Sequence, residues 1–266
     1  MTNQYISYTL VDITNNLNTK NIAAYNQKQN LNTFIQLAGL RSQPISFIVT
    51  CLKAQDLADY RFGSSYSGQH GQKTGFFLDQ RENRALLAAH AKDKKILNVF
   101  SYTGGFSISA LVAGATEVHS LDSSARALEV CEQNVALNGL DPKKHQCIQS
   151  DALEYLKSDE LSHYDIVVLD PPAFAKRASA RHAAVQGYKR INLRALQSMK
   201  PGSLLFTFSC SQAVDDALFT NTLVAAAIQA GRNVRILHRL HQPPDHPVNV
   251  FHPEGSYLKG LVLRVD

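Results

Sequence analysis

A short apolar run, Ile96-Leu97-Asn98-Val99-Phe100, leads directly into the segment Ser101-Tyr102-Thr103-Gly104-Gly105-Phe106. The length and composition of the run predict a buried β-strand. The two glycines predict a turn from this strand into a helix over residues 106–113, in which the backbone can approach a ligand closely. The glycine spacing is not G-x-G-x-x-G, so the pyrophosphate cradle of a dinucleotide site is not indicated.

Strands and helices alternate along the chain on both sides of this stretch. Besides the strand over residues 96–100, we predict strands over residues 117–121, 146–149, 165–169, 203–209, 234–240 and 257–265. Helices are expected over residues 81–90, 124–138, 190–199 and 215–230. The alternation predicts an α/β fold, a doubly wound and mostly parallel seven-stranded sheet with helices on both faces. Such sheets bind ligands at the carboxyl ends of their strands.

The composition is that of a globular protein, with 266 residues, 44% hydrophobic and 18% charged. Residues 1–65 are expected to form a short N-terminal appendage, with a helix over residues 33–40, a strand over 45–52 and a loop over 63–68. Residues 66–266 are expected to form the main domain. No apolar run reaches the length of a membrane helix and no secretory signal is visible, which indicates a cytoplasmic protein.

Four cysteines lie far apart in the sequence: Cys51, Cys131, Cys147 and Cys210. No C-x-x-C pair exists, so neither a zinc site nor a disulfide scaffold is expected. We expect Cys131 and Cys147 to be inert buried residues.

Two acidic residues follow the second and third predicted strands. Asp122 can accept hydrogen bonds from two ribose hydroxyls, and Asp151 can reach an adenine amino group. A nucleoside cofactor without a pyrophosphate site points to S-adenosylmethionine. The alternative is that Gly104-Gly105 is an ordinary loop and that Asp122 caps the helix ahead of Ser123 and Ser124.

The fourth and fifth sequential parallel strands end in chemically active groups, Asp170-Pro171-Pro172 and Ser209-Cys210-Ser211. The two strand ends should lie beside the methyl donor, because these strands are neighbours in a doubly wound sheet. A thiolate that adds to C6 of cytosine makes C5 nucleophilic enough to take a methyl group. Asp170 could assist this addition by protonating N3 or donating a hydrogen bond to it.

Other interpretations of these motifs remain open. Asp-Pro-Pro can simply terminate a strand, and a free cysteine is commonly inert. Methylation of an amino group is the competing chemistry. It favours an aromatic residue directly after the two prolines, where this chain has Ala173 and places Phe174 one residue later.

A basic stretch follows the Asp-Pro-Pro motif, since no acidic residue occurs between Asp170 and Asp215. Its cations are Lys176, Arg177, Arg181, Lys189, Arg190, Arg194 and Lys200. Such a run suits phosphate contacts with RNA, and Phe174, His182 and Tyr188 could stack on unpaired bases. A solvated helix face is the alternative. Single-stranded or splayed-out RNA is favoured, because the target base must leave its stack.

Several motifs together resemble those of the large-subunit rRNA (cytosine-5) methyltransferase I family. The matching segments are Gly71-Gln72-Lys73-Thr74-Gly75-Phe76-Phe77-Leu78-Asp79-Gln80-Arg81, residues 98–106, Asp170-Pro171-Pro172, Gly187-Tyr188-Lys189, Phe208-Ser209-Cys210-Ser211, His246-Pro247, Pro253-Glu254-Gly255 and Tyr257-Leu258-Lys259-Gly260. The resemblance covers residues 69–266. It implies a class I methyltransferase of Rossmann-like fold that uses S-adenosylmethionine to make 5-methylcytosine in large-subunit ribosomal RNA, with no metal and no membrane partner.

The resemblance also implies roles for individual residues. Cys210 is implied as the nucleophile, and the implied cofactor contacts, with their immediate neighbours, are Asp79, Arg81, residues 100–105, Asp122, Ser123, Asp151, Ala152, Asp170 and Pro171. Similar proteins carry an N-terminal PUA-type domain and a linking domain, for which the residues before position 69 are too few. A related RNA cytosine-5 group has a second cysteine where this chain has Pro172. The alternatives are an amino-group or uracil-C5 RNA methyltransferase, or an RNA-binding protein that holds S-adenosylmethionine without turnover.

Overall fold

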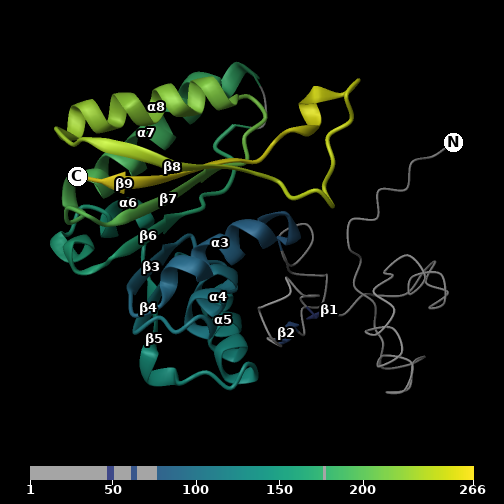
Figure 1. The fold of residues 1–266 in the computed structure, drawn as a ribbon, viewed down its shortest axis with the longest axis vertical. Helices are drawn as coiled ribbons and strands as arrows, with labels where there is room; N and C mark the ends of the chain where they lie inside the picture. The colour runs from purple at the N-terminus through teal and green to yellow at the C-terminus, as the bar shows by residue number, and fades with distance from the viewer. Residues whose placement is uncertain (1–46, 51–60, 65–76, 176–177) are drawn as a thin grey trace, which may run out of the picture. The chain divides into compact units, whose positions relative to one another are not determined.

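The computed structural model describes residues 47–50, 61–64, 77–175 and 178–266 (Figure 1). The chain forms two compact units, Met1–Leu78 and Asp79–Asp266. In the first unit, β1 (Phe47–Thr50) pairs antiparallel with β2 (Arg61–Ser64). The strand expected over residues 45–52 is therefore present as β1, whereas part of the loop expected over 63–68 belongs to β2. The helix expected over residues 33–40 lies outside the described residues.

The second unit is built on one seven-stranded sheet with the order β5-β4-β3-β6-β7-β9-β8. Its strands are β3 (Lys95–Val99), β4 (Glu117–Asp122), β5 (His145–Gln149), β6 (Ile166–Leu169), β7 (Leu204–Ser209), β8 (Val234–His241) and β9 (Lys259–Val265). Strands β3 to β7 are parallel to one another, and β9 runs antiparallel to both β7 and β8. The strand order reverses at β3, where ligands bind in open α/β sheets.

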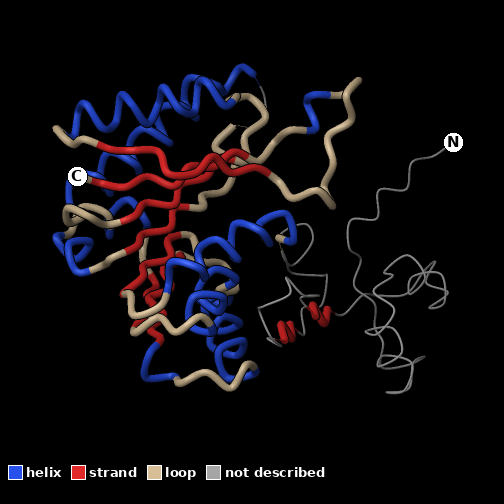
Figure 2. The backbone as a smooth tube through the Cα atoms, viewed as in Figure 1, coloured by secondary structure: helices blue, strands red, loops and turns tan. Residues whose placement is uncertain are grey.

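Helices cover both faces of this sheet, as Figures 1 and 2 show. On one face α3 contacts α4, and α4 contacts α5. On the other face α7 packs against both α6 and α8. The bounds are α3 (Arg81–Ala91), α4 (Gly105–Val112), α5 (Ala125–Leu137), α6 (Ala152–Tyr155), α7 (Arg181–Ser198) and α8 (Asp216–Ala230). The α/β fold with a mostly parallel, doubly wound sheet is confirmed.

Short 3-10 turns complete the connections: η2 (Leu78–Gln80), η3 (Pro142–Lys144), η4 (Asp159–His163), η5 (Ala178–Ala180) and η6 (Pro253–Gly255). The last of these lies in the long β8–β9 connection, which extends away from the sheet (Figure 1). Among the helices of the described residues, none combines the length and apolar character that crossing a membrane requires.

The predicted strands match the observed ones within one or two residues, and the agreement rests chiefly on the buried apolar runs of the central strands. All four residues of β6 are buried, and four of the five in β3. The helix predicted over residues 190–199 is wrong in extent, since α7 begins at Arg181. No side chain caps its first turn and Gly187 interrupts its helical pattern. A β-carbon on Gly187 would lie 2.9 Å from the ring of Phe174, so close packing explains the glycine.

Candidate active site

Four predicted site elements meet at one edge of the sheet. Strands β4, β3, β6 and β7 are parallel neighbours in that order, so their carboxyl ends lie along the same edge. Loop 100–105 follows β3, Asp122 ends β4, Asp170 follows β6 and Cys210 follows β7. The expectation that the strands carrying the loop, the carboxylate and the thiol lie side by side is confirmed.

The loop after β3 has an unusual backbone. Phe100, Tyr102 and Gly104 have φ angles of 61°, 49° and 83°, in the left-handed region that non-glycine residues seldom adopt. Gly104 also allows the helix α4 to lie close to α5, because a β-carbon there would collide with the sulfur of Cys131. Asn134 on α5 fixes the loop by donating a hydrogen bond to the carbonyl oxygen of Thr103 at 2.9 Å. Backbone strain of this kind is commonly found at ligand sites.

Asp122 holds this loop against the start of α5. Its Oδ2 accepts from the backbone N–H of Tyr102 at 2.9 Å, and its Oδ1 accepts from that of Ser124 at 2.9 Å. The N-cap of α5 is Ser124, whose hydroxyl accepts from Ala127. The alternative in which Asp122 itself caps the helix is therefore wrong. Ser123 lies exposed beside it.

Asp151 is the N-cap of α6, which begins at Ala152. Its Oδ1 accepts from the backbone N–H groups of Leu153 and Glu154 at 2.8 and 3.1 Å. The side chain is exposed at the carboxyl end of β5. Capping fixes its orientation and occupies one of its two oxygens.

Asp170 is the acidic group next to the thiol, and its surroundings perturb it. Gln80 donates a hydrogen bond to Oδ1 at 3.1 Å, and Asn83 in turn donates to Gln80 at 2.6 Å. Burial and the nearby carboxylate of Asp79 raise the pKa of Asp170 to about 7, against the opposing effects of Gln80 and Arg84. Asp170 therefore exchanges its proton near neutral pH, as a general acid or base must.

Asp79 and Arg81 flank Gln80 and contact the β8–β9 connection. Asp79 Oδ2 accepts a hydrogen bond from the hydroxyl of Tyr257 at 2.8 Å. Arg81 makes an ion pair with Asp245 at 2.5 Å. The segment before α3 is thus joined to the segment between the last two strands, although the two are far apart in the sequence.

Cys210 is half-buried at the end of β7. Its thiol donates a long hydrogen bond to the carbonyl oxygen of Pro171, with a sulfur–oxygen distance of 3.9 Å. Burial and the carboxylates of Asp170 and Asp79 raise the pKa of Cys210 to about 11. The thiol is therefore protonated at neutral pH in the chain without ligands.

Lys259, at the start of β9, supplies a buried positive charge near this thiol. Its side chain is 2% exposed, and Nζ donates to the carbonyl oxygen of Ser211 at 2.9 Å. Burial lowers the pKa of Lys259, and its charge opposes the rise in the pKa of Cys210. Lys259 was part of a matched motif, but no role for it was predicted.

The prediction that Tyr188 stacks on RNA is wrong. Its side chain is completely buried, its ring packs against Phe174 and Phe219 at centroid distances of 4.7 and 5.6 Å, and its hydroxyl lies 2.9 Å from Ser211 Oγ. Tyr188 therefore fixes the segment after Cys210 from within the core. A sequence cannot distinguish a buried aromatic on the inner face of a helix from one that faces a ligand.

The remaining predicted RNA contacts lie on α7 or outside the described residues. Arg181 and Arg190 are exposed and Lys189 is half-buried. Lys176 and Arg177 lie outside the described residues. The helix thus carries these basic residues at or near the surface, while Ala184, Tyr188 and Ile191 pack into the core.

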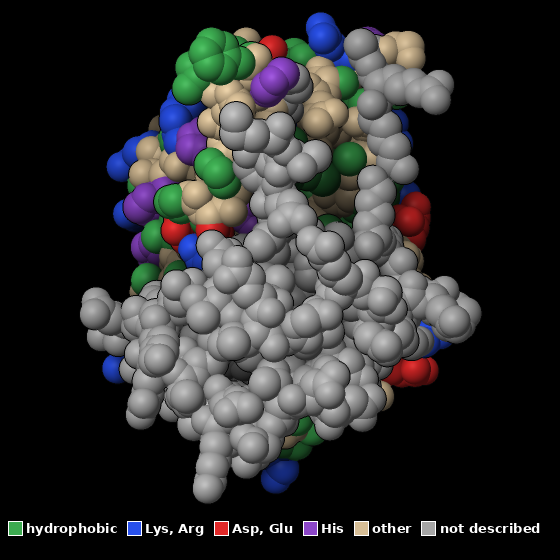
Figure 3. Space-filling model, turned by 90° about the vertical axis from the view of Figure 1, so that its right-hand side faces the viewer, with side chains coloured by type: hydrophobic (Ala, Val, Ile, Leu, Met, Phe, Trp, Pro, Cys, Tyr) green, Lys and Arg blue, Asp and Glu red, His purple; other side chains and the backbone are tan. Residues whose placement is uncertain are grey.

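A pocket of about 670 Å³ lies between α3, β8 and the β8–β9 connection. Arg239, His241 and His246 are among its polar lining residues. In the view of Figure 3, Lys, Arg and His side chains lie along one side of the described part of the surface, with hydrophobic and acidic side chains among them. No function was predicted for Arg239 or His241, because isolated basic residues on a strand form no motif.

Comparisons with known proteins agree with this geometry. The model of a family described as S-adenosylmethionine-dependent methyltransferase matches residues 50–264. The chain belongs to this family. Its homologues include the ribosomal RNA large subunit methyltransferase I of Klebsiella pneumoniae (strain 342), which is 45% identical over 199 residues, or 74% of this chain and 50% of the relative. The protein of the same name from Escherichia coli O157:H7 is 44% identical with the same coverage.

Solved structures agree in fold with this methyltransferase. A candidate SAM-dependent methyltransferase from Streptococcus mutans aligns with a TM-score of 0.71 and 25% identity, over 84% of this chain and 56% of that one. A second methyltransferase structure, in complex with SAH, aligns with a TM-score of 0.69 and 26% identity, over 84% of this chain and 57% of that one. The chain spans about half the length of the curated relatives it matches.

The residues at this edge fit S-adenosylmethionine, the cofactor of the family. Two buried oxygens, Asp79 Oδ1 and Ser101 Oγ, have no hydrogen-bond partner among the described residues. Buried polar atoms normally have partners, so both are available to the hydroxyl or amino groups of a ligand. The carboxylates of Asp122 and Asp151 add further acceptors at the ends of β4 and β5.

Proposed function

We propose that this methyltransferase transfers the methyl group of S-adenosylmethionine to C5 of a cytosine in large-subunit ribosomal RNA. The observation that carries the proposal is the position of Cys210 beside the Asp170-Pro171 motif, with its sulfur 3.9 Å from the carbonyl oxygen of Pro171. The names of the curated relatives support the choice of ribosomal RNA. S-adenosylmethionine supplies an electrophilic methyl group.

The residues that contact the cofactor lie mainly at the carboxyl ends of the parallel strands. Asp122 accepts the ribose hydroxyls, and Asp151 the adenine amino group. Asp79 accepts a hydrogen bond through the buried oxygen Oδ1. Arg81 acts through its ion pair with Asp245, which holds the segment of Asp79 against the β8–β9 connection. Loop 100–105, with Ser123, Ala152 and Pro171, completes the cofactor-binding surface.

Cys210 acts as the nucleophile. Its sulfur forms a bond to C6 of the cytosine after its proton leaves, and this makes C5 nucleophilic toward the methyl group. When the C5 proton is removed after transfer, the C5–C6 double bond re-forms, the sulfur leaves as a thiolate, and N3 returns its proton to the Asp170 carboxylate. A thiol suits this role because it both adds and leaves readily.

Asp170 supplies the proton that the addition requires at N3. Because its pKa is raised to about 7, a large share of the side chain is protonated at neutral pH and can donate to N3. Gln80 orients the carboxyl through its 3.1 Å hydrogen bond to Oδ1. The positive charge of Lys259 favours the thiolate form of Cys210.

The RNA is bound by the basic face that follows Asp170. Arg181, Lys189 and Arg190 on α7, with Lys176 and Arg177 before it, contact phosphates, since a cationic face next to the reaction site holds a splayed-out strand. The assignment of Lys176 and Arg177 rests on the sequence alone.

Analysis of the product tests this proposal. The purified protein is incubated with large-subunit ribosomal RNA from cells that lack the gene and with labelled S-adenosylmethionine, and the RNA is digested to nucleosides for mass spectrometry. We expect 5-methylcytidine with the wild type and none with Cys210→Ala. N4-methylcytidine or 5-methyluridine as the product would overturn the choice of cytosine C5. S-adenosylmethionine binding without methyl transfer to any RNA would overturn the enzymatic proposal itself.

A further inference from the structure

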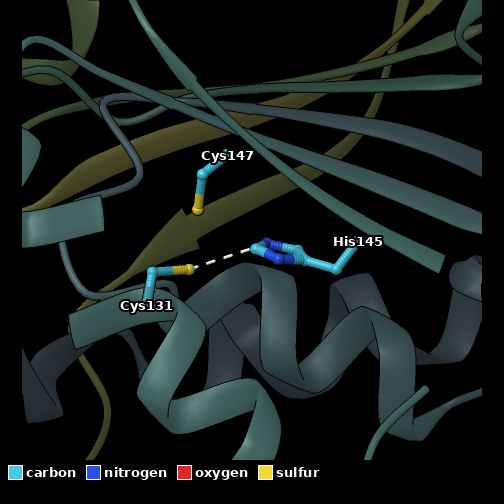
Figure 4. Close-up of side chains that lie close together, drawn as sticks. All are labelled: Cys131, His145 and Cys147. Carbon is cyan, nitrogen blue, oxygen red and sulfur yellow. Dashed lines mark hydrogen bonds between the residues drawn. The ribbon is translucent and has the colours of Figure 1, made fainter. Parts of the chain in front are cut away.

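A second group of reactive side chains lies at β5, the edge strand of the sheet, which three strands separate from β7. Cys131 on α5 comes together with His145 and Cys147 on β5, as Figure 4 shows. One nitrogen or sulfur atom from each residue lies within 4.8 Å of the others. We refer to these three residues as the Cys131 cluster. None of them takes part in the proposed methyl transfer.

The scaffold explains why the three side chains converge. His145 and Cys147 are two residues apart on β5, so their side chains leave the same face of the sheet. Helix α5 contacts β5 on that face and contributes Cys131. Cys131 is fully buried, whereas His145 and Cys147 are half-buried. A small ion can therefore reach the cluster from the side of β5.

The separation of the ligand atoms matches that around a tetrahedral metal ion. Cys131 Sγ lies 3.6 Å from His145 Nε2. Zinc bonds of about 2.3 Å to sulfur and 2.0–2.1 Å to nitrogen, at a tetrahedral angle, place the two atoms about 3.6 Å apart. Cys131 and His145 are thus already at the separation that zinc requires, and Cys147 lies within 4.8 Å of both.

A hydroxyl group lies at the edge of the cluster. Ser120 Oγ is 2.8 Å from His145 Nε2 and 3.5 Å from Cys131 Sγ. It is also held by Ser107 Oγ at 2.6 Å, so it remains anchored when His145 turns its nitrogen to a metal. From this position it can hydrogen-bond a water molecule that fills the fourth metal position.

We propose that Cys131, His145 and Cys147 form a binding site for zinc. Two thiolates and one imidazole select zinc over magnesium or calcium, which take oxygen ligands. A bound ion would join α5 to β5. It would also fix the floor of the cofactor loop, because the sulfur of Cys131 fills the space where a β-carbon of Gly104 would lie. The metal site would therefore stabilise the cofactor loop, and it would not contact the reacting atoms.

Metal titration of the full-length reduced protein tests this site. Cobalt(II) chloride is added to the metal-free wild type, and the sulfur-to-cobalt charge-transfer absorption is recorded. We expect absorption that saturates at one cobalt per chain and is displaced by zinc chloride. The variants Cys131→Ser, Cys147→Ser and His145→Gln should each weaken binding by at least about tenfold, because each loses one of three ligands. Cys210→Ser is the matched control and should bind cobalt like the wild type.

A second measurement keeps the test decisive if a ligand variant fails to fold. The wild type purified without chelator is assayed for zinc by mass spectrometry, and its melting temperature is compared with and without zinc chloride. We expect bound zinc and a higher melting temperature with the ion. No cobalt absorption from the wild type, or absorption lost only in Cys210→Ser, would overturn the proposal. None of these readouts depends on methyl transfer.

Discussion

The thiol of Cys210 and the carbonyl oxygen of Pro171 lie 3.9 Å apart, which joins the end of β7 to the end of β6. The two residues are 39 positions apart in the sequence, and the parallel pairing of these strands brings them together. This contact places the thiol next to Asp170, whose charge contributes to the raised pKa of the thiol. The proposed reaction depends on the closeness of these two residues.

Removal of the buried ammonium of Lys259 should make Cys210 less reactive. In Lys259→Met the thiol loses a positive charge that opposes the rise in its pKa. We expect alkylation of Cys210 by iodoacetamide to slow by about 3- to 10-fold at pH 8, corresponding to a pKa rise of about 0.5–1. The pH dependence of alkylation, followed by peptide mass spectrometry, measures this shift. Lys259→Arg keeps the charge and should restore most of the rate, whereas equal loss in both variants would indicate a packing role.

Asp170→Asn should change how the stability of the ligand-free protein depends on pH. The pKa of Asp170 is raised from 3.8 to about 7, so the folded state binds a proton that the unfolded state releases. Stability from this group is fully present below pH 4 and is lost as the pH rises toward and through 7. Relative to the variant, the wild type should lose roughly 1–4 kcal/mol of unfolding free energy between pH 4 and pH 8.

Urea unfolding at several pH values measures that difference. Asp165→Asn is a useful comparison, because the pKa of Asp165 is lowered, chiefly by its ion pair with Lys200 against the effect of burial. Its removal should produce a trend of the opposite sign at lower pH, with the wild type gaining stability relative to the variant as the pH rises to about 5 and little change above that. Parallel pH profiles for wild type and Asp170→Asn would contradict the raised pKa.

Gly104→Ala should disturb the cofactor loop. The new β-carbon would collide with the sulfur of Cys131, and the residue has a φ angle of 83°. We expect a loss of about 2–4 kcal/mol in unfolding free energy and weaker binding of S-adenosylmethionine by calorimetry. The double variant Gly104→Ala/Cys131→Ala should recover part of the loss, since the collision is removed and the strained backbone remains. Equal stability of the single and double variants would show that the sulfur is not the obstacle.

The basic face of α7 should contribute to RNA affinity through charge alone. For the double variant Arg181→Ala/Arg190→Ala we expect weaker binding to a single-stranded RNA fragment and a shallower salt dependence, by up to about 0.7 per lost phosphate contact. Filter binding over a range of salt concentrations measures both. Tyr188→Phe is the control. It should bind RNA like the wild type but unfold with about 1 kcal/mol less free energy, because the hydrogen bond to Ser211 is lost.

Much of the fold could be predicted because it depends on local patterns. Apolar runs such as Ile166–Leu169 are buried on both sides, and the turn at Gly104 marks the start of α4. The start of α7 at Arg181 could not be predicted, since its N-cap, Ala180, makes no side-chain hydrogen bond there. The close packing of Gly187 against Phe174 is a tertiary contact without a local signal.

Only those site residues that lie at the ends of parallel strands could be predicted from the sequence. Asp122, Asp170 and Cys210 follow or end parallel strands, so sheet topology alone brings them to one edge. Gln80 was missed because a glutamine in a 3-10 turn carries no signal, although it hydrogen-bonds Asp170.

The inward orientation of Tyr188 and the convergence of the Cys131 cluster both depend on tertiary packing, which leaves no local signal in the sequence. Tyr188 packs inward because of the elements that surround α7. The cluster joins a helix to a strand, and its spacing follows none of the short cysteine motifs by which metal sites are found in sequences. Both features appear only once the chain is folded.

Covalent trapping tests the central claim most directly. RNA containing 5-fluorocytosine at the target position is incubated with the protein and S-adenosylmethionine, and denaturing gel electrophoresis with peptide mass spectrometry locates any adduct. Fluorine cannot leave C5 as the proton does, so we predict a stable protein–RNA adduct whose modified peptide carries the RNA on Cys210, and none with Cys210→Ala. An adduct that persists in Cys210→Ala, or 5-methylcytidine formed by that variant on ordinary RNA, would contradict the account.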